Sequence, residues 1–212
     1  MSTARDDILA RVRAANPGAA VAVTPGPIPA RGRGEAAELR QRFYGGLDAA
    51  GVSHATVTGW AEVAGEIERF LRRLGAPGPV VASDDPMLDP CGLDRIEGLR
   101  RGVPDAGDAV SVTGTVAGIA ETGTLMVRSG PDIANAAHFL TDTHVAVVDA
   151  ARIVGAYEDA FALLRAGGAP MPRNVTLITG PSRSSDIERI LQIGVHGPRT
   201  LHVVVCDAGP AP

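Results

Sequence analysis

The sequence predicts an α/β fold, with an open, mainly parallel sheet flanked by helices and a helical arm at the N-terminus. From about residue 35 onward, short segments with strand periodicity alternate with segments of helical periodicity, the order that βαβ units require. Hydrophobic residues make up 45% of the chain but aromatic residues only 3%. The core must therefore consist mainly of Ala, Val, Leu and Ile, as is typical of helices packed on a parallel sheet.

Residues 1–34 are predicted to form the arm and a linker. Residues 3–15 have acidic side chains in a first helical turn and apolar side chains on one face. Residues 16–34 are rich in Pro and Gly, which cannot sustain a helix, so we expect an extended linker there. The α/β domain is then expected over residues 35–212, and the arm is a candidate contact for a second copy of the chain.

The first part of this domain reads as β/α alternation followed by a long loop. Residues 83–108 are rich in Asp, Pro and Gly and are expected to form a loop with one helical turn at residues 93–99. Loops of this length with little regular structure are often functional or mobile. The other elements expected here are helices at residues 35–50 and 61–74 and strands at residues 53–57, 79–82 and 109–113.

The second part carries denser signals. The strand at residues 144–148 is expected to be buried, and residues 200–205 alternate as a last strand. The remaining elements expected are strands at residues 124–128 and 175–179 and helices at residues 157–164 and 186–192.

The composition removes several classes of function. The formal net charge is −4 and aromatic residues are not interleaved with basic ones, so no nucleic acid is expected as a partner. All 20 basic residues are Arg, which excludes a Schiff-base lysine and a P-loop lysine. The N-terminus is acidic where a signal peptide is basic, and no apolar run reaches about 18 residues. We therefore expect a cytoplasmic protein with no membrane span.

The cysteines argue against a cluster in this chain. Cys91 and Cys206 are far apart and form no C-x-x-C motif. His138, Asp142 and His144 are a weak His/Asp ligand set, because no dense ligand motif accompanies them. We expect no metal and no cofactor here, so the metal clusters of a redox pathway would lie in partner proteins.

The most explicit candidate site is a strand followed by a Gly-Pro turn and a predicted helix. Free backbone N–H groups at such a helix N-terminus attract anions, and Arg183 adds a planar cation that can grip a carboxylate. The alternative is that the serines only cap the helix and Arg183 faces solvent. The residues of this candidate anion site are Gly180, Ser182, Arg183 and Ser184.

Two further constellations carry chemistry-bearing side chains. Glu121 in an apolar setting is a candidate acid, base or nucleophile, or alternatively a turn residue satisfied by nearby amides. Thr122, Gly123 and Thr124, which follow it, are candidate residues for binding the substrate or an anion. In the Gly-Pro turn before the last strand, His196 is a candidate general acid or base and Arg199 a candidate substrate clamp. The alternative for His196 is an ordinary surface role.

Four blocks in order resemble the lactate utilization protein C family, whose shared domain is the LUD domain. The blocks are residues 118–125 (GIAETGTL), 143–148 (THVAVV), 178–183 with 186–188 (ITGPSR and DIE), and 194–203 (GVHGPRTLHV). The resemblance implies a fold similar to the ribose-5-phosphate isomerase and CoA-transferase superfamily. It also implies a role as the cluster-free, accessory subunit of a bacterial L-lactate oxidoreductase complex, which oxidises L-lactate to pyruvate together with iron–sulfur lactate utilization proteins.

Under this hypothesis the chain binds a small carboxylate or another anionic ligand through Arg183 and Arg199, and Glu121 or His196 assists proton removal. One alternative is an independent enzyme acting on a CoA thioester or a sugar phosphate, because Glu121 before Thr122 and Gly123 resembles the glutamate nucleophile of CoA transferases. Another is a non-catalytic scaffold that uses its arm to bind the partner proteins.

Overall fold

The computed structural model describes residues 3–15, 26–27, 29–75, 78–168, 170–185, 191–194 and 196–208. For residues 184–185 and 191–193 only the backbone is described.

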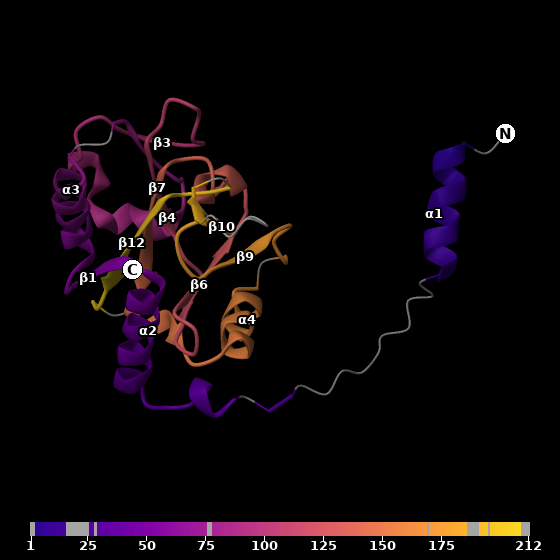
Figure 1. Ribbon diagram of the computed structural model, residues 1–212. Coiled ribbons are helices and arrows are strands. Elements are labelled where there is room, and N and C mark those ends of the chain that lie inside the picture. Colours follow the sequence, from indigo (N-terminus) through magenta and orange to yellow (C-terminus); the bar gives the residue numbers. More distant parts are fainter. Residues whose placement is uncertain are drawn as a thin grey trace.

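A six-stranded parallel sheet forms the centre of the fold (Figure 1). Its strand order is β1-β12-β7-β4-β2-β3. All seven residues of β7 and six of the seven in β12 are buried, as expected for strands covered on both faces. The strands are β1 (Ser53–Val57), β2 (Val80–Ala82), β3 (Leu99–Arg101), β4 (Val110–Gly114), β7 (Thr143–Asp149) and β12 (Thr200–Cys206).

Two smaller sheets lie beside it. A four-stranded sheet has the order β8-β5-β6-β9, in which β6 pairs antiparallel with both neighbours. A two-stranded antiparallel hairpin joins β10 and β11. Their bounds are β5 (Ala117–Ile119), β6 (Thr124–Arg128), β8 (Ile153–Val154), β9 (Val175–Ile178), β10 (Arg183–Ser185) and β11 (Leu191–Ile193).

Helices cover both faces of the large sheet. Alternate residues of β7 point to opposite faces: Val145 packs in a cluster with α3 (Val63–Arg73), whereas Ala146 packs in a cluster with α2 (Ala36–Ala50). A third helix, α4 (Tyr157–Ala166), packs on the small sheet. The predicted α/β class, with a mainly parallel sheet flanked by helices, is confirmed.

The N-terminal helix α1 (Ala4–Ala15) lies apart from the rest of the protein (Figure 1). None of its residues is buried, and Ile8 and Val12 are each 60% exposed. Most of the predicted linker lies outside the described residues. Among the described residues, no helix combines the length and the apolar character needed to cross a bilayer.

The predicted helix at residues 186–192 is wrong where the structure describes it. Leu191 and Gln192 lie in β11, which pairs with β10, and Ser185 lies in β10 where a helix cap was expected. Residues 186–190 lie outside the described part of the chain. Backbone pairing across a hairpin has overridden the local capping signal. The loop at residues 83–108 likewise contains an unpredicted edge strand, β3, and the short 3-10 helices Pro86–Cys91 and Leu93–Arg95.

Candidate functional site

The carboxyl ends of neighbouring parallel strands border a cavity of about 390 Å³, which we call the carboxyl-edge cavity. Asp85 comes after β2, Thr115 follows β4 directly, and Asp149 is the last residue of β7. Along the chain, β4 leads to β7 on one side of the sheet, whereas β2 leads to β3 on the other. The cavity therefore lies at a topological switch point, which is where open α/β sheets bind ligands.

Asp85 is a buried carboxyl group in the lining of this cavity. Its Oδ1 accepts a hydrogen bond from the backbone N of Met87 at 3.1 Å, and the residue is 8% exposed. Gly114 makes room for it, since a Cβ at that position would collide with the Asp85 carboxylate. Burial raises the pKa of Asp85 above its ordinary value, although the Met87 hydrogen bond opposes the shift. Asp85 therefore holds a proton more readily than an exposed aspartate.

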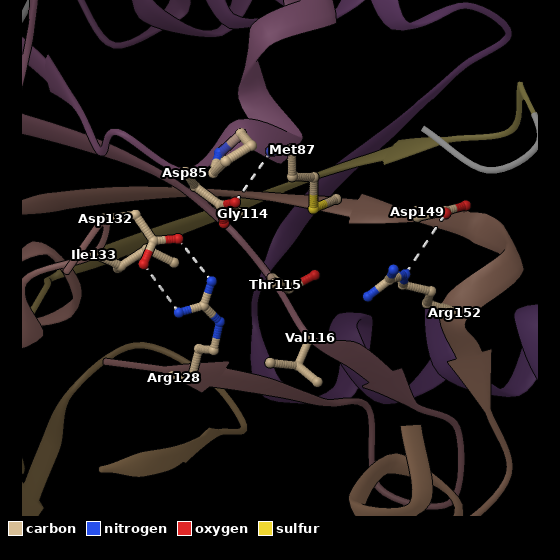
Figure 2. Close-up of a pocket in the computed structure, with 11 residues that line it drawn as sticks. Asp85, Met87, Gly114, Thr115, Val116, Arg128, Asp132, Ile133, Asp149 and Arg152 are labelled. Carbon is tan, nitrogen blue, oxygen red and sulfur yellow. Dashed lines mark hydrogen bonds and ion pairs between the residues drawn. The ribbon is translucent and has the colours of Figure 1, made fainter. Parts of the chain in front are cut away.

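Two arginines supply positive charge, and only one is fully engaged (Figure 2). Arg128 donates to both oxygens of Asp132, at 3.1 and 2.7 Å, and these bonds hold the pKa of Asp132 below its usual range. The guanidinium of Arg152 points toward Thr115 (Figure 2), and its Nε lies 3.9 Å from Asp149 Oδ2. Arg152 forms no hydrogen bond with another residue in the described part of the chain, so it can bind an anion without losing a strong partner.

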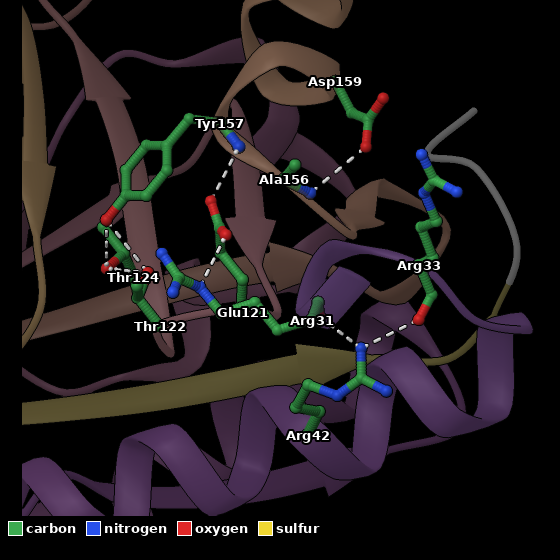
Figure 3. Close-up of polar contacts among 9 residues, drawn as sticks. All are labelled: Arg31, Arg33, Arg42, Glu121, Thr122, Thr124, Ala156, Tyr157 and Asp159. Atoms are coloured by element: carbon green, nitrogen blue, oxygen red, sulfur yellow. Dashed lines mark hydrogen bonds and ion pairs between the residues drawn. The ribbon is translucent and has the colours of Figure 1, made fainter. Parts of the chain in front are cut away.

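Glu121 lies at the turn between β5 and β6 and has both carboxylate oxygens engaged (Figure 3). Arg31 Nε donates to Oε2 at 3.0 Å, and the backbone N of Tyr157, the first residue of α4, donates to Oε1 at 3.4 Å. The Glu121 side chain is 3% exposed, whereas that of Arg31 is 67% exposed. In this geometry the carboxylate fastens the segment around Arg31 to the start of α4.

The hydroxyl groups that follow Glu121 bond to one another (Figure 3). Tyr157 Oη lies 2.9 Å from Thr122 Oγ1, which lies 2.7 Å from Thr124 Oγ1. Thr124 Oγ1 also lies 2.8 Å from Thr179 Oγ1 at the end of β9. Gly123 has a φ of +65° and touches the backbone of Gly46 in α2, so this turn is held tightly against the helix.

The predicted anion site is divided by the structure. Arg183 donates from Nη2 to the carbonyl oxygen of Ala50 at 2.8 Å, where it caps the C-terminal end of α2. Ser184 lies in β10. Gly180 and Ser182 instead line a second cavity, of about 210 Å³.

His196 and Arg199, the two candidate residues in the turn before β12, also lie apart in the structure. His196 is exposed and lines the second cavity with Gly180 and Ser182. The Arg199 side chain is 65% exposed, and its Nε lies 3.7 Å from Asp142 Oδ1. The predicted residues thus form two groups, one at the Glu121 turn and one at the second cavity, while Arg183, Ser184 and Arg199 lie outside these groups.

Comparisons with known proteins agree with this fold. The model of the LUD domain matches residues 107–206. Lactate utilization protein C of Geobacillus kaustophilus is 32% identical over 69% of this chain and 70% of its own length, and that of Deinococcus radiodurans is 32% identical over 87% and 86%. The chain belongs to the lactate utilization protein C family.

A solved structure shares the fold of this family member. A DUF162 family protein from Deinococcus radiodurans matches with a TM-score of 0.59 at 23% identity, over 82% of this chain and 99% of that chain. The sequence relatives confirm the family expected from the four sequence blocks, and the solved structure shares the fold.

The carboxyl-edge cavity of this family member was missed by the sequence analysis. Asp85, Arg128 and Arg152 are far apart in the sequence and form no linear motif. The available signal was the long loop directly after the strand at residues 79–82, because loops at the carboxyl ends of parallel strands bind ligands.

The weak His/Asp ligand set is only partly assembled. The rings of His138 and His144 lie with centroids 5.6 Å apart, whereas the Asp142 side chain is 80% exposed and lies near Arg199. In the part of the chain that the structure describes, no group of three or more His, Cys, Asp or Glu side chains is arranged to hold a metal ion.

Proposed function

We propose that the chain acts in lactate utilization, as the cluster-free subunit of a system that oxidises L-lactate to pyruvate with iron–sulfur partner proteins. The names of its relatives support the pathway. The cysteines support a role without an iron–sulfur cluster in this subunit, since Cys91 and Cys206 are both buried and free and form no cluster motif.

We propose further that the carboxyl-edge cavity binds the small carboxylate. The observation that carries this assignment is the Arg152 guanidinium, which points into the cavity and keeps its donors for a ligand (Figure 2). Thr115 Oγ1 donates to the carbonyl oxygen of Val147 at 3.0 Å, which fixes this hydroxyl in the cavity wall and leaves the proton of a ligand hydroxyl to Asp85.

Asp85 is the proton acceptor in this proposal. Oxidation of lactate to pyruvate releases two protons and two electrons. Asp85 takes the hydroxyl proton, and burial, which raises the pKa of this carboxyl, makes it a stronger proton acceptor than an exposed aspartate. The Cα–H bond breaks and its hydrogen leaves with the electron pair, as hydride, to a two-electron acceptor that the partner proteins would supply and from which the electrons would pass to their iron–sulfur clusters. Glu121 is less suited to attack a substrate, because its carboxylate is buried and both oxygens are engaged.

Arg152→Ala is expected to abolish stabilisation of the purified chain by L-lactate and pyruvate. A ligand that binds only the folded state adds about 2.7 kcal/mol at one hundred times its Kd, which raises the melting temperature by several degrees. Thermal-shift titration of the wild type and the variant measures this difference.

Arg183→Ala is the matched control, since it removes the same charge from the site that sequence predicted. If the ligand-induced shift disappears in Arg183→Ala and persists in Arg152→Ala, the carboxyl-edge assignment is wrong. With the iron–sulfur partners added, Arg152→Ala should also lower the rate of lactate oxidation by about tenfold to a hundredfold, as expected for losing hydrogen bonds to a charged group.

A further inference from the structure

A groove adjoins the carboxyl-edge cavity and is not used by the function proposed above. Its volume is about 910 Å³, against about 390 Å³ for the cavity. The other groove residues come from α4 and from two segments, one after β6 and one after α4. We call it the α4 groove. The residues that line both the groove and the cavity are Val116, Arg128, Asp132, Ile133 and Arg152.

The border between the cavity and the groove includes side chains that are not buried. The side chain of Arg152 is 54% exposed, and that of Arg128 is 31% exposed. In the view of Figure 2, Arg128, Val116 and Arg152 lie along one side of the cavity and Asp85 lies along the other. A carboxylate bound to Arg152 therefore lies at this border, next to the groove.

The groups that would hold a 2-hydroxy acid leave one direction for its side chain. Asp85 lines the cavity and not the groove, whereas Arg152 lines both. A 2-hydroxy acid that offers its hydroxyl group to Asp85 and its carboxylate to Arg152 has one substituent left on Cα besides hydrogen. The α4 groove is the larger space beside this anchor, so it can receive that substituent.

The walls of the α4 groove are largely apolar. Leu163 and Leu164 of α4 line it together with Val116 and Ile133, and Met171 adds a thioether side chain. Leu163 is 36% exposed and Met171 is 54% exposed, so their apolar surface is open to a ligand. Exposed apolar side chains gathered in a groove are typical of a ligand site.

We propose that the site takes 2-hydroxy acids whose apolar side chain is longer than the methyl group of lactate, with the carboxylate on Arg152 and the side chain in the α4 groove. The proposal rests on the function proposed for the carboxyl-edge cavity and widens its substrate class. The reaction is the same: the hydroxyl proton passes to Asp85, the Cα hydrogen leaves as hydride to the two-electron acceptor, and a 2-oxo acid forms.

A series of 2-hydroxy acids tests the groove directly. L-2-hydroxyhexanoate carries three more methylene groups than L-lactate, and each buried methylene raises affinity about fourfold. Some of this gain is lost because the bound side chain gives up rotational freedom. We expect L-2-hydroxyhexanoate to bind the full chain at least tenfold more tightly than L-lactate, with L-2-hydroxybutyrate between them. Isothermal titration calorimetry measures the dissociation constants.

Substitution of Leu163 tests where the side chain of the acid lies. Leu163→Ser places a polar group in the groove wall, so the ratio of affinities for L-2-hydroxyhexanoate over L-lactate should fall at least threefold. Leu140→Ser is the matched control, because Leu140 is 51% exposed and lines neither the cavity nor the groove. It should leave this ratio unchanged. Arg152→Ala should abolish the binding of both acids.

The outcomes separate this proposal from the function on which it rests. Binding of L-lactate that depends on Arg152, without a preference for the longer acid, would overturn the groove assignment and leave the proposed function standing. No binding of either acid would overturn both. A preference that survives Leu163→Ser would overturn the groove assignment. So would tighter binding of 2-hydroxyadipate than of 2-hydroxyhexanoate, because a terminal carboxylate on the exposed Arg173 would then decide the affinity.

Discussion

Acidification from about pH 7 to about pH 5 is expected to lower the free energy of unfolding by roughly 4 kcal/mol through two buried histidines. Burial lowers the pKa of His144 to about 3 and that of His202 to about 4. Above about pH 6.5 these two histidines are neutral in both the folded and the unfolded chain, so they contribute no pH dependence to stability. Below it, the unfolded chain binds protons that the folded chain cannot, and stability falls as the pH falls.

The groups around each ring modify this loss without reversing it. Glu66 Oε1, 3.7 Å from His202 Nε2, favours the charged ring, but desolvation is the larger effect. His138 has a lowered pKa as well and acts in the same direction. Asp85 acts in the opposite direction, because a raised carboxyl pKa gains stability on acidification.

Urea unfolding at several pH values between 7 and 5 measures the effect, and an Asp85→Asn background removes the opposing carboxyl. His202→Phe keeps a ring stacked on Phe70, as the imidazole is now with centroids 4.0 Å apart. The variant should lose about half of the pH dependence. Stability that stays constant over this range would contradict the prediction.

Adjacent glycines in α2 are expected to respond in opposite ways to the same substitution. A Cβ at Gly46 would lie 2.5 Å from Gly123 Cα and 2.7 Å from Gly123 N, both backbone atoms. Gly46→Ala should therefore destabilise the protein by about 3 kcal/mol, at the upper end for overpacking. A Cβ at Gly45 would meet nothing within 4 Å, and Gly45→Ala should stabilise the helix by up to about 1 kcal/mol.

Denaturant midpoints of the two variants, measured beside the wild type, give this comparison. Gly45→Ala is the internal control, since it makes the same chemical change one position away. A Gly46→Ala variant as stable as the wild type would show that α2 does not hold the turn at Gly123.

Five of the six strands of the large sheet were predictable because their signals were local, whereas the short edge strand β3 was not predicted. The strand at Ser53–Val57 has the predicted bounds, β7 contains an apolar run bounded by polar residues, and the strand expected at residues 200–205 matches β12. The hairpin of β10 and β11 was not predictable in this way, since it depends on pairing between segments whose local pattern favours a helix cap. Short strands such as β8 (Ile153–Val154) carry too few residues for any period to be visible.

The carboxyl-edge cavity was harder to predict because the strand order of the sheet, and not a local sequence motif, brings its residues together. Glu121 and Arg183 stood out in the sequence because they lie in Gly-containing turns. In the structure Arg183 donates to Ala50 at the end of α2, and Glu121 accepts from Arg31 and from the backbone of Tyr157 at the start of α4. Arg152 gave no such signal, since its importance comes from the strand order that places it beside Thr115. The roles of Glu121, His196 and the candidate anion-binding residues stay predictions.

Arg128 meets two parts of the structure through different atoms. Its side chain lines the carboxyl-edge cavity, and its carbonyl oxygen accepts a hydrogen bond from His138, a residue that lines the second cavity. The buried imidazole therefore helps to set where the backbone of Arg128 lies at the end of β6, and with it the position from which the guanidinium reaches Asp132. His138 in this way supports a wall of a cavity that it does not itself touch.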